Sequence, residues 1–163
     1  MSLQYFKELN EYLIKNKWNN SNVSLASITQ LEIKINKEFP KAYKEFLELT
    51  GKHFYPIHNS NTGLGGTFDF LESANENAKE QLKDYGLQNI IKRDFWTIAE
   101  SDGSIYIHYI FFDEGDNPPV YGLDMEGYTD DSMDSKEFHR KIANSFTEYI
   151  QNSINTYNHK LDK

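Results

Sequence analysis

Two apolar stripes with helical spacing, separated by one proline, lie between residues 28 and 51. The stripes are formed by Ile28, Leu31 and Ile35, and then by Tyr43, Phe46, Leu47 and Thr50. Pro40 cannot continue the first helix but suits the first turn of a second one, where its missing N–H would have no partner in any case. Ser27 with Gln30 fits a capping box before the first helix, and Gly51 suits a left-handed residue that ends the second. The sequence therefore predicts a helical hairpin.

The regions on both sides of this hairpin carry weaker signals. We expect an N-terminal helix over residues 2–17, whose apolar side is formed by Leu3, Phe6, Leu9 and Leu13. After the hairpin we expect a short strand at 53–57, a polar loop at 59–66 and a strand at 67–71. The glycines of that loop do not have the register of a phosphate-binding motif, so they favour a tight turn.

Two further helices are expected later in the chain. Ser73 suits the cap of a helix that runs to about Tyr85, where Gly86 ends it. Asp134 or Ser135 suits the cap of the last helix, whose buried stripe is formed by Phe138, Ile142, Phe146, Tyr149 and Ile150.

Three β-type runs separate these two helices, at residues 95–100, 105–112 and 120–124. Their connections are short and rich in turn residues, which is typical of antiparallel neighbours. The sequence therefore predicts an α+β fold, in which an antiparallel or mixed β-sheet is flanked by N-terminal and C-terminal helices. We expect one domain over residues 1–163, because no linker or internal repeat divides the chain.

Four short motifs resemble those of the SMI1/KNR4, or SUKH, superfamily, in the same order. They are the hairpin residues Ile28, Leu31-Glu32, Phe39-Pro40, Tyr43, Phe46-Leu47 and Thr50-Gly51, then Trp96–Gly103, Pro118–Tyr121 and Ser145–Ile150. Together they cover residues from about 25 to 152. The resemblance implies the α+β fold of that superfamily and a bacterial immunity protein that neutralises a cognate toxin, often a nuclease. For eukaryotic members the same resemblance implies a scaffold or regulatory adaptor.

Composition excludes several classes of partner. The net charge of −8 repels nucleic acid and anionic lipid, and it favours a basic protein partner. The chain has no cysteine, so it has no disulfide, and we expect a cytoplasmic protein. The N-terminal residues do not have the pattern of a signal peptide, and the longest apolar run is too short to span a membrane.

Acidic residues are concentrated between positions 113 and 137, and this segment contains only one lysine. The acids are Asp113, Glu114, Asp116, Asp124, Glu126, Asp130, Asp131, Asp134 and Glu137. One interpretation is an electronegative face that attracts a cationic partner, and the other is a solvated loop region that keeps the protein soluble. Under the first, we expect the partner-binding residues to be Asp102, Asp113, Glu114, Asp116, Asp124, Glu126, Tyr128, Asp130 and Asp131. Exposed tyrosines beside these acids, such as Tyr106, Tyr109, Tyr121 or Tyr128, would be natural hot spots.

No motif for catalysis, a cofactor or a metal stands out. The segment after Asp113 lacks the register of a calcium loop, and the scattered histidines do not form a zinc motif. Asp113 lies five residues after His108, so in a strand the two side chains point to opposite faces, and His108 is expected to be a packed or edge histidine. There is no Gly-x-Ser-x-Gly nucleophile motif.

The expected function is therefore a non-enzymatic protein-binding module that occludes the active site of a toxin. An intracellular scaffold or regulatory adaptor of the same fold is the first alternative. A metal-dependent hydrolase that uses the acidic segment 113–134 is the second.

Overall fold

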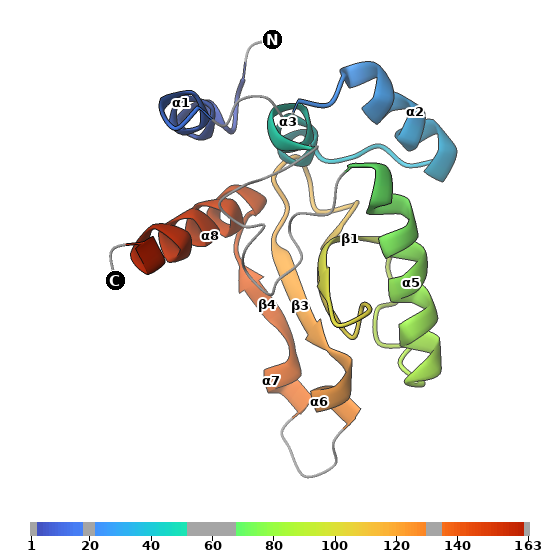
Figure 1. The fold of residues 1–163 in the computed structure, drawn as a ribbon. Coiled ribbons are helices and arrows are strands. Elements are labelled where there is room, and N and C mark those ends of the chain that lie inside the picture. The colour runs from blue at the N-terminus through green and yellow to red at the C-terminus, as the bar shows by residue number, and fades with distance from the viewer. Residues whose placement is uncertain (1–2, 18–21, 52–67, 130–134, 162–163) are drawn as a thin grey trace.

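The computed structural model describes residues 3–17, 22–51, 68–129 and 135–161. In this part of the chain the elements are α1 Lys7–Lys15, α2 Leu25–Ile35, α3 Lys41–Thr50, η1 Phe68–Phe70, α5 Leu71–Asp84, β1 Phe95–Ser101, β2 Tyr106–Phe111, β3 Val120–Asp124, α6 Met125–Thr129, α7 Ser135–Phe138, β4 His139–Ala143 and α8 Phe146–Leu161. The fold is α+β, as the sequence predicts, with helices around a central sheet (Figure 1). The strand expected at 53–57 and the loop expected at 59–66 lie outside the described residues.

The described sheet has four strands in the order β1-β2-β3-β4, and all neighbours are antiparallel. The first three strands confirm the predicted meander, with boundaries within one residue of those expected at both ends of each strand. A bulge between Thr97 and Ala99 interrupts the pairing of β1 with β2. The sheet therefore runs in chain order, and its successive connections lie at alternating ends.

Alternate side chains of β2 belong to two different clusters of the core, one on each face of the sheet. Ile110 packs with residues of α1, α2, α3 and α8 on one face of the sheet. Ile107, Tyr109 and Phe111 pack with α5 on the other face. Figure 1 shows α5 and α8 on opposite sides of the sheet. The two layers explain why both alternating sets of β2 side chains are largely apolar or aromatic.

Helix α1 is shorter than the 2–17 helix that the sequence predicts. The carboxylate of Glu45, which is 8% exposed, accepts hydrogen bonds from the backbone N–H groups of Gln4 and Tyr5, each at 2.8 Å, and of Phe6 at 3.2 Å. These contacts hold the chain before α1 against α3. A buried carboxylate is stable here because backbone donors surround it.

The helical hairpin is confirmed, but three details of its caps were wrongly predicted. The N-cap of α2 is Ser24, whose Oγ accepts from the N–H of Ser27 at 3.1 Å, so Ser27 is inside the helix. Pro40 is the N-cap of α3 and precedes its first turn. Gly51 has a φ of −60°, so it is not left-handed. Its small size matters for packing instead, because a Cβ there would lie 2.5 Å from the Leu47 carbonyl oxygen.

The strand expected at 67–71 was also wrong for the described residues 68–71, which form η1 and the start of α5. Helix α5 begins at Leu71, two residues before the predicted cap Ser73. Leu71 and Asn75 lie one turn apart, and both are on the buried face of the helix, so the apolar contacts of Leu71 include it in the helix. Asn75 donates to the Thr97 carbonyl at 3.0 Å and accepts from the Thr97 N–H at 2.7 Å. The side chain of Asn75 thus supplies hydrogen-bond partners for the backbone N–H and carbonyl of Thr97, on the edge of β1 that is unpaired in the described sheet, beside its bulge. Gly86 follows the helix with a φ of +70°, as predicted.

The single last helix predicted from Asp134 or Ser135 onward was wrong. Residues 139–143 form β4, which pairs with β3, and α8 begins only at Phe146. A second cap makes the break: Ser145 Oγ accepts from the Glu148 N–H at 3.1 Å, and Glu148 accepts from the Asn144 N–H at 3.0 Å. The helical spacing of Ile142 and Phe146 therefore arises across a strand–helix junction.

Candidate functional site

The described acids among the predicted partner-binding residues fall into two groups at opposite ends of the sheet. We call Asp113, Glu114 and Asp116 the loop-end acids, because they lie in the connection between β2 and β3. We call Asp102, Asp124 and Glu126 the hairpin-end acids, because they surround the β1–β2 turn and the end of β3. Asp130 and Asp131 lie outside the described residues.

The loop-end acids bind cations of the chain itself. Arg93 pairs with Asp113 and donates from Nη1 to Glu114 Oε1 at 3.0 Å. Its guanidinium carbon also lies 4.0 Å from the ring centre of Phe111. Hydrogen bonding to Arg93 lowers the pKa of Asp113. Asp116 accepts from Lys41 Nζ at 2.7 Å. This end of the sheet is therefore largely neutralised.

The hairpin-end acids surround the exposed ring of Tyr106. Asp124 lies directly opposite Tyr106 in the pairing of β2 with β3. The charge of Asp124, followed by partial burial and by the charges of Glu126 and Asp102, raises the pKa of Tyr106. Among the described residues, no cation forms an ion pair with any of these three carboxylates. Within the described part of the chain, the hairpin end therefore keeps an unbalanced negative charge.

Local backbone geometry positions these carboxylates. Asp102, Gly103 and Ser104 have φ angles of +51°, +67° and +70°, which turn the chain tightly between β1 and β2. Ser104 is fully buried and donates to Glu100, which anchors the turn. Asp124 Oδ1 accepts from the Gly127 N–H at 2.9 Å and so caps α6. The carboxylate of Asp124 is thereby fixed beside Tyr106.

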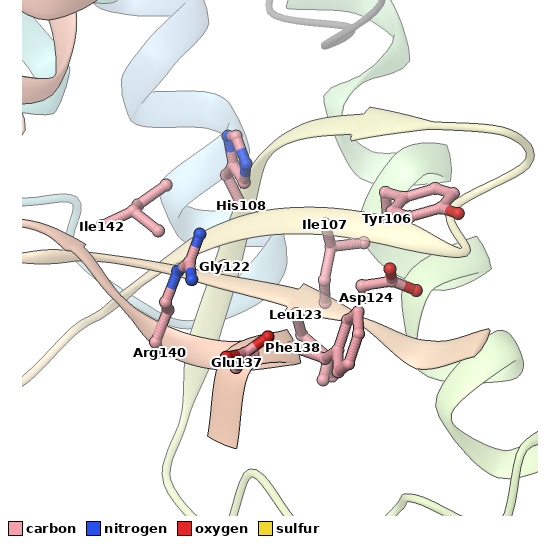
Figure 2. Close-up of a pocket in the computed structure, with 10 residues that line it drawn as sticks. All are labelled: Tyr106, Ile107, His108, Gly122, Leu123, Asp124, Glu137, Phe138, Arg140 and Ile142. Carbon is pink, nitrogen blue, oxygen red and sulfur yellow. The ribbon is translucent and has the colours of Figure 1, made fainter. Parts of the chain in front are cut away.

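A groove of about 360 Å³ lies next to Tyr106 and crosses β2, β3 and β4. Its lining residues are Tyr106, Ile107, His108, Gly122, Leu123, Asp124, Glu137, Phe138, Arg140 and Ile142 (Figure 2). Figure 2 shows Tyr106 and Asp124 together at one end, while Arg140 extends from β4 nearer the other. Gly122 keeps the floor open, because a Cβ there would lie 3.2 Å from Ile142 Cγ2. The groove combines apolar walls with charges of both signs.

His108 forms part of the groove wall and is a packed histidine, as predicted. Its Nδ1 lies 2.6 Å from the hydroxyl oxygen of Tyr149 in α8. Burial lowers the pKa of His108 to about 4, so the imidazole is neutral at pH 7. Asp113 binds Arg93 at the other end of the sheet, so the structure does not bring it to His108.

The predicted tyrosines differ in their surroundings. Tyr106 is 37% exposed, whereas Tyr109 is 1% exposed and its hydroxyl lies 2.7 Å from His139 Nε2. Tyr121 is partly buried and donates to Glu114 Oε1 at 3.1 Å. Tyr128 is also partly buried and contacts the ring of His139 edge-on. The geometry thus selects Tyr106 as the aromatic side chain at the unbalanced acidic end.

Sequence reasoning did not find the groove, because it depends on strand register. His108, Gly122 and Arg140 become neighbours only when β2, β3 and β4 pair. Arg140 was expected in a helix, so its place in the sheet was not foreseen. The usable signal was Ser145-x-x-Glu148, a capping-box pattern inside the expected last helix.

The described residues contain no group of three or more His, Asp or Glu side chains that could hold a metal ion. Within the same ranges, no helix is both long and apolar enough to cross a membrane.

Sequence comparison assigns the family. Among curated protein sequences, none is significantly similar to this chain. The family model of the SMI1 / KNR4 family (SUKH-1), by contrast, matches residues 22–152, which include both ends of the sheet and the whole described groove. The chain therefore belongs to the SMI1/KNR4 (SUKH-1) family.

Proposed function

We propose that this chain is an immunity protein that binds a basic surface of a cognate bacterial toxin and thereby occludes its active site. The SUKH superfamily is known for immunity proteins, which makes this the first function to consider for a member. The observation that carries the proposal is the hairpin end, where three carboxylates without an ion-pair partner in the described chain surround an exposed tyrosine beside a groove.

The physical requirements of such an inhibitor are shape and charge complementarity. Unbalanced carboxylates accelerate encounter with a cationic partner, and an aromatic side chain supplies a contact that buries much area at low entropic cost. If the toxin is a nuclease, its substrate groove is lined with Lys and Arg that bind phosphate. Carboxylates of the hairpin end would then occupy the positions of phosphates. No bond is made or broken in this mechanism.

The test requires the cognate toxin domain, which would first be sought in the reading frame next to the one that encodes this chain. Its association with the protein would be followed by stopped-flow fluorescence at several salt concentrations. Asp102→Lys with Glu126→Lys reverses two hairpin-end charges and leaves the Asp124 cap intact. The matched control, Glu8→Lys with Glu11→Lys, makes the same charge change on exposed positions of α1, away from the hairpin end.

We expect the hairpin-end reversal to slow association at low salt at least about tenfold and to flatten its salt dependence. The control should change the rate much less. Equal slowing by both pairs would show that only net charge matters, and would remove the hairpin end from the proposal. A wild-type protein that neither binds the toxin nor protects cells that express it would disprove the immunity function.

A further inference from the structure

We propose that the Tyr106 end of the groove is a subsite for an arginine side chain of the partner, with the guanidinium stacked on the Tyr106 ring and paired with Asp124. This inference rests on the proposed function, because it names the partner side chain that the hairpin end recognises.

The first support is the free ring of Tyr106. In contrast to Tyr109 and Tyr121, which stack on each other, Tyr106 packs against no other ring in the described part of the chain. It begins β2, and it is 37% exposed. An exposed aromatic face among carboxylates attracts a cation through both the ring quadrupole and the surrounding charges.

The second support is the fixed orientation of Asp124. One of its oxygens accepts from the Gly127 N–H at 2.9 Å, and the other receives no hydrogen bond from the described residues. The capping bond holds the carboxylate in place, and the second oxygen is left to accept from a partner. A carboxylate held in this way loses little side-chain entropy when it binds.

The third support is the groove, which favours arginine over lysine. A guanidinium is flat, stacks on aromatic rings and pairs with a carboxylate through two N–H groups, whereas an ammonium group is a compact and strongly hydrated charge. Arg140 lies along the same groove and Figure 2 places it away from Tyr106, so a partner cation is directed to the Tyr106–Asp124 end. The open floor at Gly122 leaves space for the side-chain stem.

The experiment is an NMR titration of the ¹⁵N-labelled protein with three capped tripeptides, Gly-Arg-Gly, Gly-Lys-Gly and Gly-citrulline-Gly. We expect the arginine peptide to shift the amide signals of Tyr106, Asp124 and Gly127 at millimolar concentration. The lysine peptide should bind about tenfold more weakly, because it gains less from stacking. The citrulline peptide keeps the planar shape without the charge and should give no saturable shift.

Three variants test the two side chains. Tyr106→Ala should abolish the response, and Tyr106→Phe should retain it, since the ring face is preserved. Asp124→Asn keeps a residue that can cap α6 and removes the charge, so it should weaken binding of the arginine peptide about tenfold. Dispersed spectra of each variant confirm that it is folded.

Equal binding of the arginine and lysine peptides, an unaffected Tyr106→Ala variant, shifts centred on the loop-end acids, or no binding at all would each overturn the subsite. The toxin assay separates this inference from the proposed function. Neutralisation of the toxin without a peptide response at Tyr106 rejects the subsite alone. A peptide response without any toxin binding rejects the immunity function alone.

Discussion

The two ends of the sheet carry the same number of candidate acids, but the acids differ in whether they form ion pairs within the fold. At the loop end, Arg93 and Lys41 bind the carboxylates, and the connection between β2 and β3 is fixed to the rest of the fold. At the hairpin end, three carboxylates surround Tyr106 without a cation from the described chain. The acidic residues of the loop end are therefore paired within the fold, whereas those of the hairpin end have no ion-pair partner among the described residues.

This difference shows that the density of acids along a sequence is a poor measure of the electrostatic field. The cation that neutralises Asp116 lies 75 residues earlier in the chain, and Arg93 lies 20 residues before Asp113. A field that can steer a partner depends on charges that remain unbalanced after folding. The comparison can be tested by changes that separate stability from binding.

The largest effect on stability is expected from pH, and it separates the buried His108 of the groove wall from the loop-end acid Asp113. His108 has a pKa of about 4 in the folded protein because it is buried, against an ordinary value of 6.5. Below pH 6.5 the unfolded chain therefore binds a proton that the folded protein does not. Stability falls as pH drops from 6.5 to about 4, by roughly 3 kcal/mol at most from this group.

Asp113 also contributes stability that is lost as the pH falls, but the cause is its hydrogen bond to Arg93 and not burial, and the pH range is lower. Hydrogen bonding to Arg93 lowers the pKa of Asp113, so the stabilisation is present at neutral pH and is lost only as the pH falls below 3.8, the ordinary pKa of an Asp side chain. Urea unfolding at pH 7, 5.5 and 4.5, followed by tryptophan fluorescence, should show the loss in the wild type and a flatter profile in His108→Gln. A profile that remains as steep in His108→Gln would assign the loss to other groups.

Local pattern was sufficient for β1, β2 and β3 and for the two helices of the hairpin. The three β-type runs were predicted closely because alternation and turn residues are local properties. The last helix was mispredicted because Phe138, Ile142 and Phe146 have helical spacing, while pairing with β3 decides the conformation of 139–143. Gly51 was expected to be a left-handed residue that ends α3, whereas its φ is −60° and its lack of a side chain allows close contact with Val23. In both cases tertiary contacts determine the outcome: the strand conformation of 139–143 and the need for a glycine at position 51.

The candidate site was predictable only in part. The sequence indicated acids and tyrosines as candidate partner-binding residues, and Asp102, Asp124 and Glu126 were among them. It could not separate them from the loop-end acids, because the separation depends on where Arg93 and Lys41 lie after folding. Their role in binding a partner stays a prediction.

A pair of matched truncations compares the two ends directly. Glu114→Ala removes an acceptor for Arg93 and for the Tyr121 hydroxyl, so we expect it to lower the free energy of unfolding by about 1–3 kcal/mol. Glu126→Ala removes an exposed carboxylate that has no ion pair in the described chain, so its effect should stay within about 0.5 kcal/mol. Urea unfolding at pH 7 measures both. Equal losses would mean that the hairpin-end acids also support the fold, and the distinction between the ends would fail.

The smallest change in stability is expected at the groove floor. In Gly122→Ala the new methyl group would lie 3.2 Å from Ile142 Cγ2 and 3.4 Å from His108 Cδ2, so the half-buried Ile142 must shift slightly. Replacing a glycine in a strand also reduces the entropy of the unfolded chain, which offsets part of the crowding. The net change should be about 1 kcal/mol or less.

The same methyl group narrows the groove, so binding of the arginine peptide should weaken while the unfolding midpoint hardly moves. Gly127→Ala is the contrasting variant, because its Cβ would lie 2.3 Å from Phe138 Cδ1 and should cost far more stability. If Gly122→Ala destabilises the protein as strongly as Glu114→Ala, the groove floor is part of the structural core. The hairpin end would then resemble the loop end, where side chains are committed to the fold and none is reserved for a partner.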